Sequence, residues 1–164
     1  MIKLFVFDVD GCMSDGSIIY DTNGCESKIF DVKDGFAMIS LAPLGFKSAI
    51  ITGRESAIVA RRAKELQISH LYQNVKDKKS VLQEILKKEG LGFENVAAIG
   101  DDFNDLRLLR SVGHSFAPND ANEIVKKSVT TVLSKNGGRG AVREMIEIVL
   151  AKEQKMQEWI TLWQ

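Results

Sequence analysis

The order of apolar and polar residues along the chain predicts alternating strands and helices. The opening run over residues 2–7 is mostly large and apolar and ends in Asp and Gly, which is typical of a buried strand. Further strands are expected over 48–52, 70–73, 96–100, 114–116 and 130–133, and helices over 35–44, 56–66, 78–89, 105–110 and 141–152. This alternation predicts an α/β fold with three layers, a Rossmann-like, mainly parallel sheet covered by helices on both faces.

A hairpin interrupts the alternation after the first strand. Asp21-Thr22-Asn23-Gly24 lies between β-prone runs over 17–20 and 27–32, and Asn-Gly in such a place favours a tight turn. We therefore expect a β-hairpin flap over about residues 16–32 and no large cap domain. The 164 residues suffice for a single domain, 1–164, with a polar tail over about 153–164. Trp159 and Trp163 in this tail are expected to dock on this or another subunit.

The amino-acid composition limits the classes of partner that the protein can bind. Lys and Arg number 22 and Asp and Glu number 22, so no net charge favours nucleic acid or an anionic membrane surface. Two cysteines are too few for a disulfide framework and show no metal-ligand spacing. The chain has no apolar run of about 18 residues and no pattern of a signal peptide. We expect a cytoplasmic protein that acts on a small molecule.

Polar residues follow four of the predicted strands. In chain order they are Asp8 and Asp10, then Thr52-Gly53-Arg54, then Asp77-Lys78, and finally Gly100-Asp101-Asp102 with Asp105. The carboxyl ends of parallel strands lie at one edge of the sheet, which is where open α/β folds bind ligands. The four groups are therefore predicted to form one site.

The residue types in this site suit phosphoryl transfer. An Asp nucleophile and a phosphate dianion repel each other, by roughly 4 kcal/mol per charge pair at about 4 Å and an effective dielectric near 20. Lys78 supplies one positive charge, which is too little beside four nearby carboxylates. Oxygen ligands select a hard cation, so a Mg²⁺ site is expected. In this scheme Asp8 attacks phosphorus and Asp10 moves protons, while Thr52 and backbone N–H groups hold phosphoryl oxygens.

These four motifs, in this order, resemble the haloacid dehalogenase superfamily of phosphatases over nearly the whole chain. The resemblance implies that Asp8 is the nucleophile, Asp10 the acid/base and Thr52 the phosphate-binding residue. The lysine of the family's third motif would be Lys78, although its neighbour Lys79 competes for that position. The implied metal ligands are the carboxylates of Asp8 and Asp101 and the main-chain carbonyl of Asp10, with Asp102 and Asp105 orienting ligands or metal-bound waters.

Three segments resemble a narrower family, the small capless phosphatases that act on 3-deoxy-D-manno-octulosonate 8-phosphate. They are residues 8–16 with the following hairpin, residues 51–54, and the Gly-rich segment 137–144. The resemblance implies a homotetramer in which hairpins pack together and a neighbouring subunit closes each active site. It also implies a role in lipopolysaccharide biosynthesis.

The substrate is less narrowly defined than the reaction. Gly53 and Arg54 are expected to contact the substrate, and Arg54 favours the eight-carbon one, because a relative that acts on a nine-carbon sugar acid phosphate has Glu after the Thr-Gly pair. Arg62 and Arg139 are candidates to bind the sugar carboxylate, since guanidinium matches a planar anion; competing candidates are Arg61, Lys64 and Arg143. The alternatives are a nine-carbon, sialic acid-like 9-phosphate and, from another class, a non-catalytic phospho-receiver or interaction module.

Overall fold

A six-stranded parallel sheet forms the centre of the protein in a computed structural model that describes residues 1–164. The strand order is β5-β4-β1-β6-β7-β8, and every neighbouring pair is parallel. The strands are β1 (Leu4–Phe7), β4 (Lys47–Ile51), β5 (His70–Tyr72), β6 (Val96–Ile99), β7 (His114–Ala117) and β8 (Thr131–Val132). The predicted parallel α/β architecture is confirmed, with β1 at the point where the chain changes direction across the sheet.

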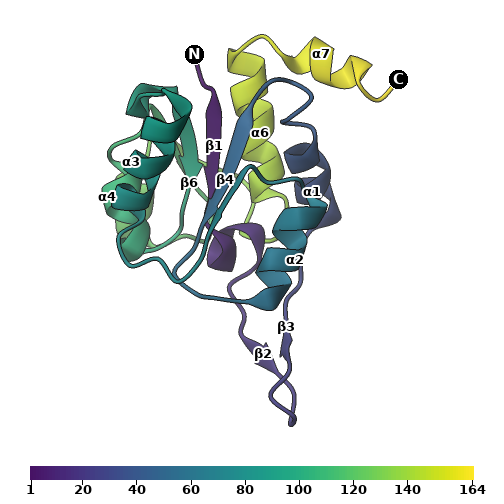
Figure 1. Cartoon of the computed structure of the whole chain (residues 1–164), viewed down its shortest axis with the longest axis vertical. Helices are drawn as coiled ribbons and strands as arrows, with labels where there is room; N and C mark the ends of the chain where they lie inside the picture. The colour runs from purple at the N-terminus through teal and green to yellow at the C-terminus, as the bar shows by residue number, and fades with distance from the viewer.

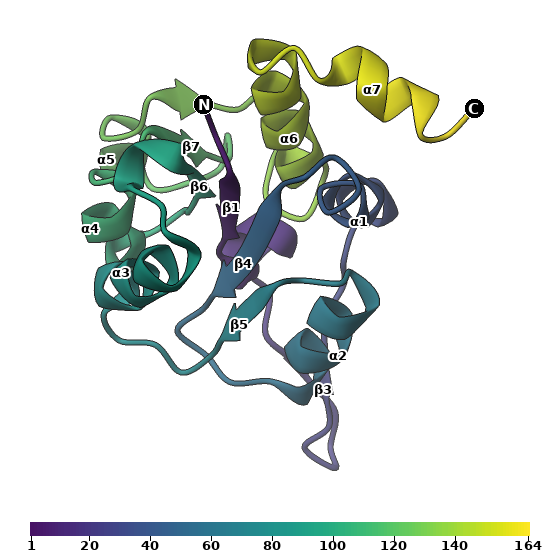
Figure 2. The same cartoon turned by 45° about the horizontal axis from the view of Figure 1, so that its top comes forward.

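Helices cover both faces of this sheet (Figures 1 and 2). One face carries α1 (Val32–Ile39), α2 (Ala57–Glu65) and α6 (Ala141–Lys152); the other carries α3 (Lys78–Glu89), α4 (Leu106–Leu109) and α5 (Glu123–Lys126). Successive side chains of a strand point to opposite faces, so Phe5 and Phe7 join the first core, and Leu4 and Val6 join the second. Two apolar cores explain why the β1 sequence is a continuous apolar run.

Capping residues set the helix boundaries. Helix α3 begins after Asp77, whose side chain accepts a hydrogen bond from the Ser80 N–H, and ends at Gly90 in the left-handed conformation. Helix α1 begins at Val32, because the Asp31 carboxylate accepts from the N–H groups of Lys33 and Asp34. The expected strand over 27–32 and helix start at 35 were therefore wrong at this junction.

The hairpin extends from the body of the protein as β2 (Ile19–Tyr20) and β3 (Glu26–Ser27) (Figure 1). Its strands are shorter than predicted, and no cap domain is present. Short helical turns not foreseen from the sequence are η1 (Val9–Met13), η2 (Phe93–Asn95), η3 (Phe103–Asp105) and α5. No helix has the length and apolar character needed to cross a bilayer.

The C-terminal tail folds back on its own chain through α7 (Met156–Thr161). Trp159 is buried, and the guanidinium carbon of Arg143 lies 4.5 Å from the centre of its ring. The Trp163 ring lies 4.4 Å from that of Phe36, and its Nε1 donates to Ser40 Oγ at 3.2 Å. Both tryptophans therefore contact this subunit, and Arg143 is part of this packing.

Asp34 links α1 to α6 and makes stability depend on pH. Its Oδ1 accepts from the Arg143 N–H at 2.7 Å, but its Oδ2 is buried without a partner. Burial raises the pKa of Asp34 from 3.8 to about 6, with a further rise from Asp31 and opposition from backbone donors and Arg143. Since the folded-state pKa is above the unfolded one, this contribution to stability is complete below about pH 4 and is lost as pH rises through 6.

Asp34→Asn should remove this dependence. Between pH 4 and pH 7 the free energy of unfolding of wild type should fall, relative to that of the variant, by up to about 3 kcal/mol. Denaturant titrations across this range measure the difference. Asp21→Asn, which removes an exposed acid of the hairpin turn, is the matched control; an equal change in both variants would contradict the assignment to Asp34.

Candidate active site

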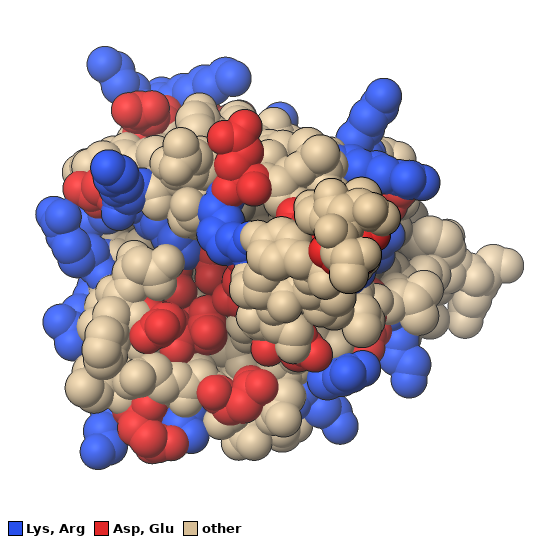
Figure 3. Space-filling view, turned by 90° about the horizontal axis from the view of Figure 1, so that it is seen from below, with Lys and Arg blue, Asp and Glu red and all other residues tan.

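A polar cavity of about 210 Å³ lies at the carboxyl ends of β1, β4 and β6. Figure 3 looks at this end of the molecule and shows carboxylates gathered in a hollow beside the mostly uncharged hairpin. The cavity has no hydrophobic lining residue; it is lined by Asp8, Asp10, Thr52, Gly53, Arg54, Asp101, Asp102 and Asn104. The structure thus brings together residues from three of the four predicted loops. Lys78, from the remaining loop, does not line the cavity but donates a hydrogen bond to Asp8.

Lys78 is buried between two carboxylates. Its Nζ donates to Asp8 Oδ1 at 2.7 Å and to Asp105 Oδ1 at 2.6 Å, and all three side chains are nearly inaccessible to solvent. Burial alone would lower the pKa of Lys78, but the charges of Asp8 and Asp105 outweigh it and raise that pKa. The ammonium therefore remains charged. Lys79 instead lies over the Phe93 ring, so the geometry selects Lys78 as the lysine of the site.

Asp105 supports the site from outside the cavity. Its Oδ2 accepts from the N–H groups of Asp101 at 3.1 Å and Asp102 at 3.4 Å, while its Oδ1 holds Lys78. Asp102 is exposed, caps η3 through the Phe103 N–H and lines the cavity. These contacts fix the backbone from which the Asp101 carboxylate enters the site.

The irregular η1 turn follows β1 directly and carries Asp10. Gly11 has φ of +91°, and a Cβ on it would lie 2.1 Å from Asp101 Oδ2. Only glycine suits both the backbone conformation and this close approach. Gly11 therefore lets the chain change direction here, in the η1 turn that sequence reasoning did not foresee.

The acidic groups lack sufficient positive charge among the protein's own residues. Burial raises the pKa of Asp8 to about 6, with a further rise from Asp105 and opposition from Lys78. Burial also raises the pKa of Asp101 to about 8, together with the charges of Asp8, Asp105 and Asp102. A divalent cation between Asp8 and Asp101 would offset this repulsion.

The donor atoms fit a hard cation. Carboxylate oxygens of Asp8 and Asp101 and the Cys12 sulfur lie within 4.8 Å of one another. Burial and three nearby carboxylates raise the pKa of the Cys12 thiol well above its usual value, so it stays protonated and is a poor ligand. The carboxylates of Asp8 and Asp101 are therefore the oxygen donors of this cluster that suit Mg²⁺, and the thiol was the member that sequence reasoning did not place here.

The Gly-rich segment supports the first loop. The Gly138 N–H donates to Cys12 O at 2.8 Å, and the Gly137 N–H donates to Asp120 Oδ1 at 2.9 Å. A Cβ on Gly137 would lie 1.9 Å from Gly11 O, which is a backbone atom that cannot rotate away. This segment is therefore packed against the turn that carries Asp10.

Gly137→Ala should damage both the fold and the site. We expect a loss of about 3 kcal/mol in the free energy of unfolding, because the added methyl group displaces main chain. Activity should fall by about 10-fold or more through movement of the first loop. Gly45→Ala is the control: Gly45 has φ of +83° with open space around it, so only a backbone cost of about 1–2 kcal/mol is expected. Equal effects of the two substitutions on activity would contradict the supporting role.

The candidate arginines lie in different places. Arg54 lines the cavity, and its buried Nη1 has no hydrogen-bond partner. Arg62 lines a second cavity between α2 and the chain after the hairpin, with its guanidinium over Phe30 and 3.3 Å from Glu65. Arg139 is 64% exposed and lies 3.9 Å from Asp15. Neither Arg62 nor Arg139 lines the acidic cavity, so their contact with substrate stays a prediction.

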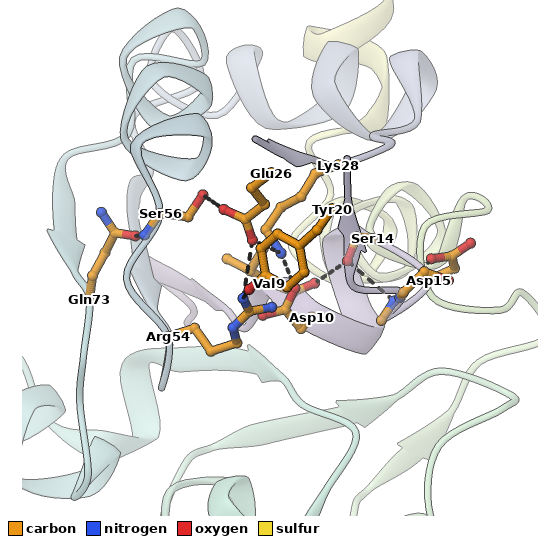
Figure 4. A network of polar contacts seen from close by, with 12 residues as sticks. Val9, Asp10, Ser14, Asp15, Tyr20, Glu26, Lys28, Arg54, Ser56 and Gln73 are labelled. Carbon is orange, nitrogen blue, oxygen red and sulfur yellow. Dashed lines mark hydrogen bonds and ion pairs between the residues drawn. The ribbon is translucent and has the colours of Figure 1, made fainter. Parts of the chain in front are cut away.

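Sequence reasoning missed the part of the site that comes from the hairpin. Lys28 and Glu26, at the base of β3, join Asp10 and Arg54 in one polar network (Figure 4). Asn104 also lines the cavity. Alternating exposed positions in a hairpin give no signal for a buried lysine, so this contact required the three-dimensional structure.

The parallel sheet and the acidic site at its edge define a class of hydrolase, which comparison with known proteins identifies. The sequence matches the haloacid dehalogenase-like hydrolase family over residues 65–146. It is 39% identical over 157 residues to 3-deoxy-D-manno-octulosonate 8-phosphate phosphatase KdsC of Escherichia coli (strain K12), covering 96% of this chain and 84% of that one. The Haemophilus influenzae protein of the same name is 38% identical, with coverage of 94% and 86%. The chain belongs to the 3-deoxy-D-manno-octulosonate 8-phosphate phosphatase family within these hydrolases.

Solved structures give the same result. The 3-deoxy-D-manno-octulosonate 8-phosphate phosphatase from Moraxella catarrhalis, in complex with magnesium ion, phosphate ion and a KDO molecule, superposes with a TM-score of 0.96 at 43% identity. That match covers 99% of this chain and 94% of the other. The cobalt-bound phosphatase from Haemophilus influenzae has a TM-score of 0.90 at 38% identity, with coverage of 94% and 90%.

Proposed function

We propose that the protein is a Mg²⁺-dependent phosphatase that hydrolyses 3-deoxy-D-manno-octulosonate 8-phosphate to the free sugar acid and phosphate. The observation that carries this proposal is the Asp8 carboxylate, held by Lys78 at the end of β1 and facing Asp101 across the acidic cavity. The choice of substrate is supported by the relatives, which are phosphatases of this sugar acid phosphate, and by Arg54, a cation that lines the cavity.

Each residue then has a separate task. Asp8 attacks phosphorus in line and forms an aspartyl-phosphate, while Asp10 protonates the leaving alcohol and later deprotonates the attacking water. Thr52 and the N–H groups of its loop hold phosphoryl oxygens, and Lys78 offsets negative charge as it develops. The backbone of Thr52 is fixed for this task, since its N–H donates to Tyr72 O and its carbonyl accepts from Val75 N.

The metal would be held by the Asp8 and Asp101 carboxylates and the Asp10 carbonyl, with Asp102 and Asp105 as orienting acids. When bound, Mg²⁺ supplies the positive charge that lets an anionic nucleophile approach a phosphate dianion. Gly53 and Arg54 contact the substrate in this proposal, and Arg62 and Arg139 meet its carboxylate.

The proposal includes assembly and location. A homotetramer would bring the exposed apolar residues of the hairpin region, Ile18, Ile19, Tyr20, Ile29 and Val32, against a neighbouring subunit. A neighbour would also cover the open cavity and exclude water from it. We place the protein in the cytoplasm, where its two unpaired cysteines would stay reduced. Its proposed role there is in lipopolysaccharide biosynthesis.

A substrate panel tests the function. Eight- and nine-carbon keto-acid phosphates are assayed for released phosphate in Mg²⁺, and the eight-carbon 8-phosphate should give the highest kcat/KM. Arg54→Glu should change that preference more than it changes the melting temperature, which falls only through loss of the partly exposed ion pair with Glu26. A higher kcat/KM for a nine-carbon 9-phosphate would assign the alternative substrate, and no hydrolysis of any member would overturn the proposal.

Removal of the metal should abolish turnover. With EDTA, phosphate release should fall at least about 10²-fold, because the carboxylates of the site otherwise repel the substrate by several kcal/mol. Added Mg²⁺ should restore the rate. Full activity after exhaustive chelation would exclude the metal-dependent reaction, and a Ca²⁺ arm controls for a general effect of divalent ions on folding.

A further inference from the structure

Lys28 is a buried cation in an otherwise exposed hairpin. Its side chain is 1% exposed, while its neighbours Ser27 and Ile29 are exposed to solvent. Its Nζ lies 2.5 Å from Asp10 Oδ1 and 3.5 Å from Glu26 Oε1. Burying an ammonium group is unfavourable unless it is paired, and hairpin lysines can usually reach water. The burial of Lys28 therefore points to a specific task for its charge.

The contact with Lys28 determines the direction of the Asp10 carboxylate. No other group of the chain donates a hydrogen bond to that side chain, which is 22% exposed. Asp8, by comparison, is held by Lys78. The two carboxylates that begin the first loop are thus each oriented by one buried lysine, and the two lysines come from different parts of the fold.

Lys28 is in turn fixed by Glu26 and the second loop (Figure 4). Glu26 Oε2 accepts from Ser56 Oγ at 2.6 Å, and Glu26 Oε1 accepts from Arg54 Nη2 at 3.2 Å. Arg54 Nη2 also donates to the Tyr20 hydroxyl at 3.0 Å. The hairpin is therefore connected by charged contacts to the loops after β1 and β4 of its own subunit.

We propose that Lys28 is a positioning residue that aims the Asp10 carboxylate for proton transfer, so that the hairpin contributes to catalysis within its own subunit. This inference rests on the proposed function, in which Asp10 is the acid/base. A lysine that only attached the hairpin to the body would not need the Asp10 carboxylate as its nearest partner. A lysine that bound substrate directly would be expected among the residues lining the acidic cavity, and Lys28 lines the neighbouring one instead.

Lys28→Met tests the proposal through the two steps that Asp10 serves. With the sugar phosphate, kcat should fall about 10²-fold at nearly unchanged KM, because a general acid contributes 10²–10⁴-fold. With p-nitrophenyl phosphate the leaving group needs no proton, so Asp8 is phosphorylated quickly while hydrolysis stays slow. The variant should then release a burst of about one p-nitrophenolate per subunit before slow turnover.

Controls separate positioning from folding and binding. Lys33→Met removes an exposed lysine nearby and should leave kinetics unchanged, and Lys28→Arg, which keeps the charge, should recover part of kcat. Unchanged kinetics in a folded Lys28→Met protein, or a rise in KM at constant kcat, would overturn the inference. A crystal structure of Lys28→Met in which the Asp10 carboxylate keeps its direction would also overturn the inference, whatever the activity of wild type. Failure of wild type to hydrolyse any phosphate ester would instead refute the proposed function.

Discussion

Asp8→Asn should lower phosphate release at least about 10³-fold, because an amide cannot form the acyl-phosphate bond on which turnover depends. Wild-type protein quenched in acid during turnover should carry phosphate on the peptide containing Asp8, and the variant should carry none. Mass spectrometry of the digested protein measures this directly. Phosphate on another residue in wild type would contradict the assignment of the nucleophile.

The fold should survive this substitution. Burial raises the pKa of Asp8 to about 6, which means that ionised Asp8 lowers stability at neutral pH. A neutral Asn should therefore leave the free energy of unfolding at pH 7 unchanged or higher, while Lys78 keeps Asp105 as a partner. Asp10→Asn is the matched control, since it should still form the phosphoenzyme and lose it slowly.

The architecture could be predicted because its signals are local. Asp77 and Gly90 bracket α3, and the expected helices over 78–89 and 141–152 have the observed bounds. The Asp31 cap that begins α1 was an equally local signal, and overlooking it extended the hairpin strand too far. The four loops could be placed together because parallel strands end at one sheet edge.

The rest depends on contacts between distant residues. The η1 turn is stabilised by Gly137 and Gly138, more than a hundred positions along the chain, and no local propensity indicates it. Lys28 is buried through its contacts with Asp10 and Glu26. Its neighbours in the sequence are those of an ordinary exposed hairpin, so they give no sign of this burial. Sequence reasoning therefore located the residues expected to carry the chemistry and the orienting acid Asp105, and missed the contacts that Glu26 and Lys28 make from the hairpin.

Lys78→Met should reduce both stability and activity, because it leaves Asp8 and Asp105 as buried acids with no cation. We expect a loss of about 3–5 kcal/mol in the free energy of unfolding, as for other broken buried pairs. The loss should be larger at pH 8 than at pH 5: the pKa of Asp8 is already raised to about 6 and rises further without the ammonium, so at pH 5 the carboxyl group is protonated. Turnover should fall about 10²–10³-fold.

A second substitution separates the two effects of Lys78. Lys78→Met combined with Asp105→Asn removes one negative charge with the positive one, so it should recover much of the stability lost by the single variant. Activity should stay low, because the double variant has no ammonium group beside Asp8 to offset the charge of the phosphoryl group. Lys79→Met, at the adjacent half-buried position, should change stability by no more than about 1 kcal/mol, the size of its contact with the Phe93 ring, and leave turnover intact. If the double variant regained activity with its stability, Lys78 would serve the fold alone, and charge compensation in the transition state would have to come from the metal and Arg54.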